Sequence, residues 1–170
     1  MDQKQQLEEL FDKWRRKSNH DATFIEDGIV NLPKWINQRP KVLFFLKEAY
    51  GGSFDFIAVM NIKKSHGQKQ SDNADLEKFL AEDKAELAAE LKIIDPDVIL
   101  CGNTFHLLQS ADIFTGMRKG KSDDYIWNGK LIINYWHPAG RGIVANNEVK
   151  YYAIREICRA AHYCFGITAW

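Results

Sequence analysis

The chain has 170 residues, the size of one ordinary domain with room for a sizeable core. Apolar residues make up 45% of it and charged residues 27%, a balance typical of globular proteins rather than disordered ones. Its 23 basic residues match its 23 acidic ones, so a surface that binds nucleic acid would have to be a local patch. No apolar run approaches the ~20 residues of a membrane span, and the polar, acidic amino end is not typical of a signal peptide. We therefore expect one domain over residues 1–170 and no membrane partner.

Three cysteines, an odd number without close spacing, are typical of a protein from the reducing cytoplasm. Cys158 and His162 lie one helical turn apart and could share a metal ion, but zinc needs further ligands and none is close in the sequence. The alternative is that both side chains lie on a half-buried helix with ordinary partners. We expect a cytoplasmic monomer without a metal, an iron–sulfur cluster or another cofactor.

Helical spacing of apolar residues predicts an amphipathic helix near the amino end. The positions i, i+3, i+4 and i+7 are Leu7, Leu10, Phe11 and Trp14. Two short apolar runs follow, KVLFFL (41–46) directly after Pro40 and FIAVMNI (56–62). Because both are short, rich in β-branched or aromatic residues and without polar alternation, we expect two buried strands.

Helical periodicity returns over residues 73–94, and Pro96 marks the end of that helix. The run DVILCG (97–102) predicts a third buried strand, and a short helix is expected through residues 105–108.

The dipeptide Asn128-Gly129 is a strong turn signal in front of KLIINYW (130–136), which predicts a fourth strand. A last amphipathic helix is expected from about residue 146 to 163. Its apolar face carries Val149, Ala153, Ile157 and Ala161.

Buried strands separated by helical segments predict an α/β fold with a four-stranded, mainly parallel sheet covered on both faces, a three-layer sandwich. In such sheets ligands bind outside the carboxyl ends of the strands. Polar residues and glycines concentrate there. They are Lys47, Glu48 and Tyr50 after the first strand, Asn61, Lys63 and Lys64 after the second, Asn103 after the third, and His137, Gly140 and Arg141 after the fourth.

Four short motifs at these strand ends resemble the uracil-DNA glycosylase superfamily. Lys-Glu-Ala-Tyr-Gly (47–51) stands where one branch has Gly-Gln-Asp-Pro-Tyr-His and another has Gly-Glu-Ala-Pro-Gly. The last residue of AVMN (58–61) matches an Asn at the end of the family's next strand. Residues 96–102 resemble its third strand, and His-Pro-Ala (137–139) stands for its second signature, His-Pro-Ser.

More narrowly, the segments 24–30, 41–50 and 61–67 resemble an uncharacterised bacterial branch of this superfamily. The resemblance covers nearly the whole chain and implies the strand order 2-1-3-4. It also implies an activity, the hydrolysis of the N-glycosidic bond of uracil or another deaminated base in DNA.

The resemblance assigns roles to the polar strand ends. His137 would donate to the oxygen of the departing base, where negative charge develops, and Glu48 would contact the base or position water. Asn61 would read the paired edge of the base, since an amide both donates and accepts. Ala49 and Tyr50 would lie beside the base. The candidates for contacts with the DNA backbone are Lys47, Lys63, Lys64, Gly140 and Arg141.

Each role has a plainer alternative. His137, before a proline, could be a structural turn residue, and Glu48 could be a surface acid. Asn61 could cap a turn by bonding its own backbone. The pair Lys63-Lys64 could belong to a solvated loop.

Two departures from the family pattern bear on activity. Ala49 stands where the best-known branch has an Asp that activates water, although one active branch also has Ala. Family members also place a long segment, with an aromatic residue that stacks on the base, before the Asn strand. Here the nine residues Lys47 to Asp55 intervene, and Tyr50, Phe54 or Phe56 could supply the aromatic ring.

Nine extended residues reach roughly 30 Å at ~3.3 Å each, which is enough for a helix-free crossover between parallel strands. If the link were a hairpin, Asn61 would lie at the wrong end of the sheet. Besides an active glycosylase, a degenerate module that binds a nucleotide, nucleic acid or protein remains open. A generic nucleotide-binding enzyme is disfavoured because the chain lacks Gly-x-Gly-x-x-Gly and a P-loop.

Overall fold

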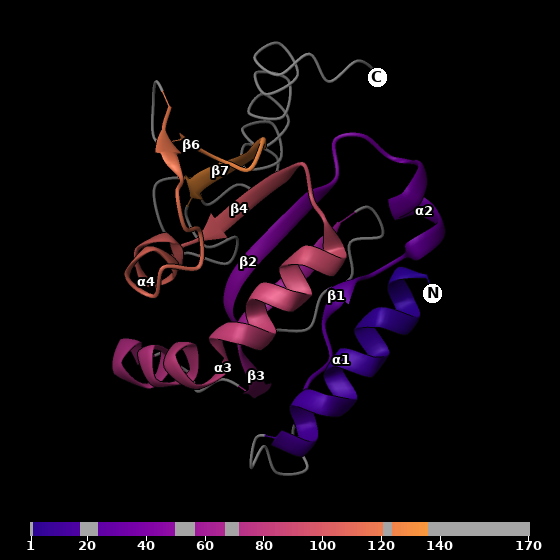
Figure 1. Ribbon diagram of the computed structural model, residues 1–170, viewed down its shortest axis with the longest axis horizontal. Coiled ribbons are helices and arrows are strands. Elements are labelled where there is room, and N and C mark those ends of the chain that lie inside the picture. The colour runs from indigo at the N-terminus through magenta and orange to yellow at the C-terminus, as the bar shows by residue number, and fades with distance from the viewer. Residues whose placement is uncertain (1, 18–23, 50–56, 67–71, 121–123, 136–170) are drawn as a thin grey trace, which may run out of the picture.

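The computed structural model describes residues 2–17, 24–49, 57–66, 72–120 and 124–135, and it has an α/β architecture (Figure 1). Within these ranges the helices are α1 (Gln3–Lys17), α2 (Leu32–Asn37), α3 (Asn73–Ile94) and α4 (Phe105–Ser110). The strands are β1 (Gly28–Ile29), β2 (Val42–Ala49), β3 (Ala58–His66), β4 (Val98–Gly102), β5 (Arg118–Lys119), β6 (Asp124–Trp127) and β7 (Lys130–Tyr135). They form one sheet in the order β1-β3-β2-β4-β7-β6-β5. No helix among the described residues is long and apolar enough to cross a bilayer.

The predicted four-stranded sheet is wrong in extent, because the described part of the sheet has seven strands and is mixed. The four strands expected from the sequence are its middle, β3-β2-β4-β7, and they pair in parallel. At one edge β1 pairs antiparallel with β3, and at the other β6 and β5 continue from β7 as an antiparallel meander. The turn between β6 and β7 places Asn128 and Gly129 at φ 50° and 77°, values that suit these two residue types.

The link between β2 and β3 is a crossover, not a hairpin. Leu43 pairs with Ala58 and Leu46 with Asn61, so the two strands run in the same direction. Both strands also extend further than the apolar runs that predicted them, β2 to Ala49 and β3 to His66. Asn61 therefore lies inside β3 rather than at its end.

The helix predicted over residues 73–94 is confirmed, since α3 spans Asn73–Ile94. The side chain of Asp72 accepts a hydrogen bond from the backbone N–H of Ala74 and so caps the first turn. At the other end Asp95 adopts a left-handed conformation with φ 48° and donates its N–H to the Leu91 carbonyl, immediately before Pro96.

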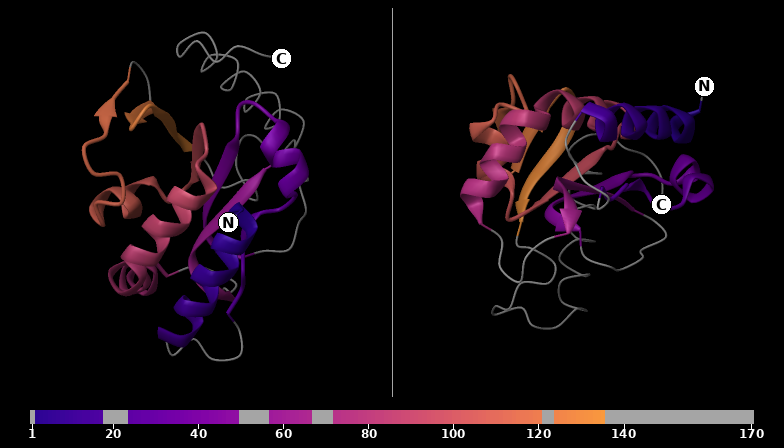
Figure 2. Two further views of the ribbon diagram at one scale, coloured as in Figure 1. Left: turned by 45° about the vertical axis from the view of Figure 1, so that its right-hand side comes forward. Right: turned by 90° about the horizontal axis from the view of Figure 1, so that it is seen from below.

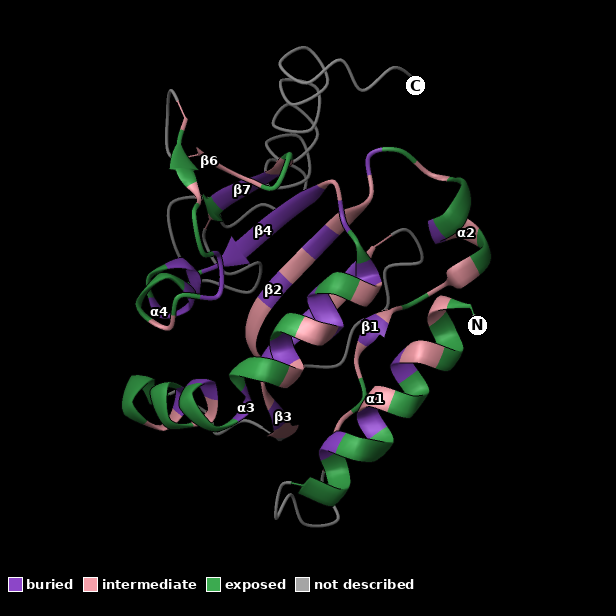
Figure 3. Ribbon diagram, viewed as in Figure 1, coloured by how far each residue is buried: buried purple, intermediate pink, exposed green. Residues whose placement is uncertain are grey.

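The main core lies between α1, α3, α4 and one face of the sheet (Figure 2). Leu7, Phe11 and Trp14 of α1 are buried here, and they lie at the spacing that predicted the helix. Exposed residues occur between the buried ones along α1 and α3, whereas β2 and β4 are buried or half-buried throughout the parts described (Figure 3).

The opposite face of the sheet carries a second, smaller apolar cluster. Its fully buried members are Val98, Leu100, Leu131 and Ile133. The described helices α1, α2, α3 and α4 all contribute buried residues to the first cluster, so helices on both faces are not seen within the described residues. The helix expected over residues 146–163 lies outside them.

Candidate functional site

The carboxyl ends of the four parallel strands meet at one edge of the sheet. Phe45 of β2 pairs with Met60 of β3 and with Cys101 of β4, which fixes one row across the sheet. One residue further along, Asn61 lies beside Leu46.

The same row continues on the other side of β2. Gly102 of β4 pairs with Tyr135, the last residue of β7. Asn61 and Tyr135 thus lie in one row, three strand spacings or roughly 14 Å apart. His137 follows two residues after Tyr135 and lies outside the described residues.

The loop after β4 ties this edge together. Asn103 adopts a left-handed conformation with φ 59°, and its N–H donates to the Tyr135 carbonyl at 2.8 Å. The next residue, Thr104, is buried, and its hydroxyl donates to the Phe45 carbonyl at 2.8 Å. The ends of β4 and β7 are therefore tied to each other and to the middle of β2.

Asn61 is 2% exposed and is bound by Asp27, which directly precedes β1. Its backbone N–H donates to Asp27 Oδ2 at 2.7 Å, and its side-chain Nδ2 donates to the same oxygen at 2.8 Å. The alternative in which Asn61 caps a turn through its own backbone is wrong, because the residue lies in a strand and bonds another segment. Its Oδ1 is buried and has no donor among the described residues.

Lys64 belongs to a buried cluster of charges beneath α1 and α3. Its Nζ donates to Asp27 Oδ1 and, at 2.6 Å, to Glu90 Oε2 of α3. The side chains of Lys64 and Glu90 are 0% exposed and that of Asp27 is 7% exposed. The ammonium also lies 5.1 Å from the ring centroid of Trp14 and 5.7 Å from that of Phe11.

Two carboxylates share one ammonium in this cluster, and this arrangement shifts the pKa values of Lys64 and Glu90. Burial raises the pKa of the Glu90 carboxyl well above its usual range; the negative charge of Asp27 adds to the effect, and Lys64 opposes it. Burial alone would lower the pKa of Lys64, but the two carboxylates outweigh it, so that the pKa is raised. The pKa values of Lys64 and of Glu90 are thus both raised, Lys64 by its two carboxylate partners and Glu90 mainly by burial.

Lys64 is accordingly not placed to contact a phosphate, which corrects that expectation. Lys63 and Lys47 lie instead near the start of α3. Lys63 Nζ donates to Asp75 Oδ2 at 2.7 Å, and Lys47 Nζ donates to Asn73 Oδ1 at 3.2 Å. The alternative of a solvated loop is wrong for Lys63 and Lys64, because both belong to β3.

Other predicted site residues are described in part or not at all. Glu48 and Ala49 form the end of β2, where Glu48 pairs with Lys63, and their backbone alone is described. The predicted site residues outside the described ranges are Tyr50, His137, Gly140 and Arg141. The candidate aromatic residues Phe54 and Phe56 and the pair Cys158 and His162 also lie outside them.

The structure adds two residues that sequence reasoning missed, Asp27 and Glu90. One signal was available: Lys64 continues the alternation of Ala58, Met60 and Ile62, all on the buried face of β3. A lysine at an inward position needs carboxylate partners, although their identity does not follow from the strand itself.

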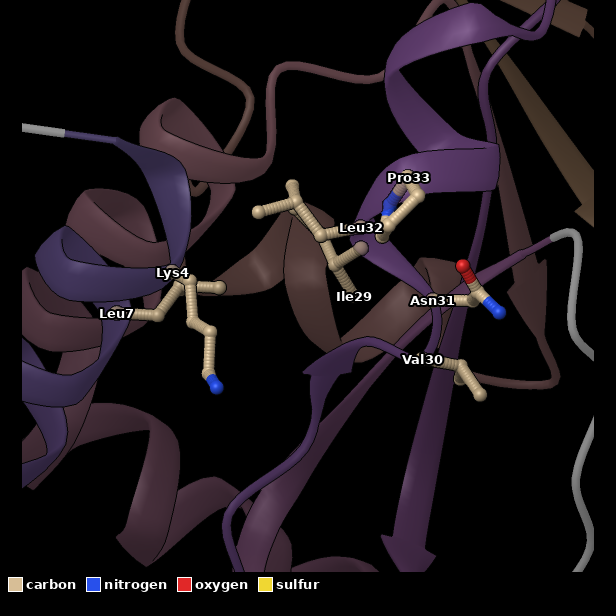
Figure 4. A pocket seen from close by; sticks show the side chains of 7 residues that line it. All are labelled: Lys4, Leu7, Ile29, Val30, Asn31, Leu32 and Pro33. Atoms are coloured by element: carbon tan, nitrogen blue, oxygen red, sulfur yellow. The ribbon is translucent and has the colours of Figure 1, made fainter.

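A hollow of about 390 Å³ lies at the opposite, amino-terminal edge, between α1 and the start of α2 (Figure 4). Its lining residues are Lys4, Leu7, Ile29, Val30, Asn31, Leu32 and Pro33. Ile29 pairs with Ala58, the first residue of β3, which places the hollow away from the candidate site. Lys4 stands apart from Asn31 across the apolar residues, so the hollow lacks the convergent polar groups of a typical ligand site.

Among the described residues no group of three or more His, Cys, Asp or Glu side chains is placed to hold a metal ion. Cys101 is a free, buried thiol whose pKa is raised by burial. No protein-family model matches the chain, and no curated protein is similar enough to it to indicate a relationship.

Proposed function

We propose that this chain is a base-handling domain of the uracil-DNA glycosylase kind, which hydrolyses the N-glycosidic bond of uracil or another deaminated base in DNA. The observation that carries the proposal is the parallel pairing of β2 with β3 in the middle of the sheet. Asn61 therefore lies in the row where β4 and β7 end, while β2 and β3 continue past that row on the side where ligands bind in open α/β sheets.

The chemistry requires a base taken out of the DNA stack. The bond between the sugar C1′ and the base nitrogen breaks, and its electron pair leaves with the base. The oxygen of a water molecule bonds to C1′, and one proton of that water is released. In this scheme His137 donates a hydrogen bond to the base oxygen that gains charge, and Glu48 orients the water. The reaction needs DNA and water, without a metal or other cofactor.

Asn61 supports recognition of the base. Its carboxamide is fixed by Asp27, and its oxygen has no donor among the described residues. Lys47 and Lys63, at the same edge, are suited to hold the DNA backbone together with Gly140 and Arg141. Lys64 takes no part in this contact, because it is enclosed.

A second candidate function is a module that binds nucleic acid, a nucleotide or a protein without cleaving a bond. The observation that favours it is Ala49 at the end of β2, which leaves this strand end without the carboxylate of the best-known branch. The short link over residues 50–57 also leaves little chain for a wall on which a base could stack.

Excision assays distinguish the two functions. Single-stranded oligonucleotides that carry one uracil, hypoxanthine or xanthine are incubated with the protein at low salt, which favours weak backbone binding. We expect base release, reduced about 10²–10³-fold in His137→Ala, the usual loss for one donor to a developing anion. Absence of release from both the unchanged protein and Ala49→Asp would reject the glycosylase and favour the binding module.

A further inference from the structure

Asp27 accepts three hydrogen bonds, and their division between its two oxygens is informative. Oδ1 faces the ammonium of Lys64, while Oδ2 accepts from the backbone N–H of Asn61 at 2.7 Å and from its Nδ2 at 2.8 Å. An ionised carboxylate can accept but not donate. The amide nitrogen of Asn61, and not its oxygen, must therefore face Asp27.

This contact determines what the rest of the Asn61 carboxamide offers. One Nδ2 proton is bound to Asp27, so the second Nδ2 proton and Oδ1 remain. Oδ1 is buried and has no donor among the described residues, a costly state for an amide oxygen. The carboxamide thus presents one acceptor beside one donor.

We propose that Asp27 is a positioning residue that fixes the Asn61 carboxamide so that its oxygen accepts the ring N–H of a bound base. The remaining Nδ2 proton then serves the carbonyl next to that N–H. Uracil, hypoxanthine and xanthine present this N–H beside a carbonyl, as thymine and guanine also do, whereas cytosine and adenine present a bare ring nitrogen beside an amino group. The inference rests on the proposed function and adds Asp27 to it as the residue that orients Asn61.

Asp27 is itself held firmly enough for this role. Lys64, bound to Glu90, fixes the Oδ1 side. The backbone N–H of Ile25 donates to the Lys64 carbonyl at 2.7 Å, and Gly28 pairs with Val59, so β3 holds the chain on both sides of Asp27. The carboxylate is thereby fixed at both of its oxygens and along its backbone.

The competing account is that Asp27 merely anchors β1 to β3. The variant Asp27→Asn separates the two accounts. A carboxamide has one acceptor oxygen where the carboxylate has two. The charged ammonium of Lys64 attracts that oxygen more strongly than the neutral donors of Asn61 do, so the NH₂ faces Asn61, whose backbone N–H loses its acceptor as well. Donors then face donors, and the Asn61 amide turns over to present its NH₂ to the base instead of its oxygen.

The first measurement is the affinity for single-stranded oligonucleotides with one central uracil or one central cytosine, by fluorescence anisotropy at low salt. We expect the unchanged protein to prefer uracil and Asp27→Asn to reduce that preference by roughly tenfold or to reverse it. Glu90→Gln is the matched control, because it alters the same charge cluster but keeps the Asp27–Asn61 contact. The preference for uracil should persist in it.

The second measurement is the hydrogen-exchange rate of the Asn61 side-chain NH₂ by ¹⁵N NMR, with the signal assigned by its loss in Asn61→Ala. We expect slow exchange in the unchanged protein and in Glu90→Gln, and exchange at least roughly tenfold faster in Asp27→Asn. Exchange in the unchanged protein as fast as in free asparagine would overturn the proposal even if Asp27→Asn failed to fold.

The outcomes keep the two proposals apart. Equal loss of preference in Asp27→Asn and Glu90→Gln, or an unchanged preference in Asp27→Asn, would make Asp27 an anchor and leave the proposed function standing. If the unchanged protein neither distinguishes uracil from cytosine nor releases a base, the proposed function fails. Slow exchange of the Asn61 side-chain NH₂ would then show that Asp27 holds Asn61, although the protein does not recognise a base.

Discussion

The two edges of the sheet are closed in different ways. At the β1–β3 edge Lys64, Asp27 and Glu90 form a cluster of charges with almost no exposure to solvent. At the β5–β6 edge, aromatic rings pack the strands against the neighbouring helix and loop. Phe105 stacks on Tyr125 with ring centroids 4.4 Å apart, and Phe114 meets Trp127 edge-on at 5.3 Å.

The difference shows at which edge the geometry of the side chains is more strictly fixed. Aromatic pairs gain mainly from buried area and tolerate small shifts. A buried ammonium with two carboxylates is stable in few geometries, because each unpaired charge is costly. The edge closed by charges is also the one that fixes Asn61, so the more demanding construction lies beside the candidate site.

The largest effect is expected from Lys64→Met. The variant leaves Asp27 and Glu90 facing each other without a cation, and removing one partner of a buried ion pair costs about 4 kcal/mol. Urea denaturation at neutral pH measures this loss in the free energy of unfolding. Lys63→Met is the matched control on the preceding residue of β3. The Lys63 side chain is 11% exposed and its partner Asp75 is 39% exposed, so the carboxylate left behind can be hydrated and the loss should be clearly smaller, about 1 kcal/mol. Equal losses in the two variants would contradict the contrast.

The aromatic edge should respond less. Phe105→Ala removes a ring that is 4% exposed and stacked on Tyr125, for which we expect a loss of about 3 kcal/mol in the free energy of unfolding. Because no charge is involved, the loss should be the same at pH 5 and pH 8. A loss that varied with pH would show that this edge is coupled to the charged one.

At acidic pH the smallest change in the free energy of unfolding is expected from Glu90→Gln. This variant tests the charged edge through the pH dependence of its stability. Burial raises the pKa of Glu90 above its ordinary value of 4.5, so the folded state keeps a proton that the unfolded chain has released. The unchanged protein therefore loses stability as pH rises from about 4.5 through the raised pKa.

The Glu90→Gln variant lacks this group and should lose the pH-dependent fall, so its stability relative to the unchanged protein rises with pH. Thermal unfolding followed from pH 5 to pH 8 tests this. The contribution of Lys64 is retained below its ordinary pKa of 10.5 and is lost only as pH rises through its raised pKa, outside that window. Parallel pH profiles for the two proteins would mean that Glu90 is ionised in the folded state.

Local signals predicted some elements to the residue. The helix over 73–94 begins after Asp72 and ends before Pro96, and both capping signals lie next to the helix they bound. The Asn128-Gly129 turn was likewise visible, because these two residue types suit the positive φ values that a tight hairpin requires.

Features that depend on distant partners were not predictable in this way. The strands β2 and β3 looked shorter than they are, because the polar residues Lys47, Lys63 and Lys64 resembled strand ends. Lys64 remains in the sheet because Asp27 and Glu90, 37 and 26 residues away in the chain, neutralise it. The strands β1 and β5 have two residues each, too few to show a periodic pattern in the sequence. They are defined by their pairing with β3 and β6.

The same dependence bears on the site. A parallel crossover between β2 and β3 is enough to predict on which side of the sheet Asn61 lies. The identity of its hydrogen-bond partner, Asp27, cannot be predicted in this way. The segment FIEDGIV supported a family resemblance and gave no indication that its second acid would bind an amide in β3.

The cluster of Lys64, Asp27 and Glu90 also limits which substitutions this sequence can accept during evolution. A single replacement of Lys64, Asp27 or Glu90 leaves a charge or a polar atom stranded in the core, whereas replacing all three by apolar residues of similar volume can leave stability intact. Related chains are therefore expected to hold the three residues together or to have exchanged all of them, with few intermediates between. In chains that have exchanged them, position 61 would be released from its present partner as well, so the identity of residue 27 should vary together with that of residue 61 across lineages.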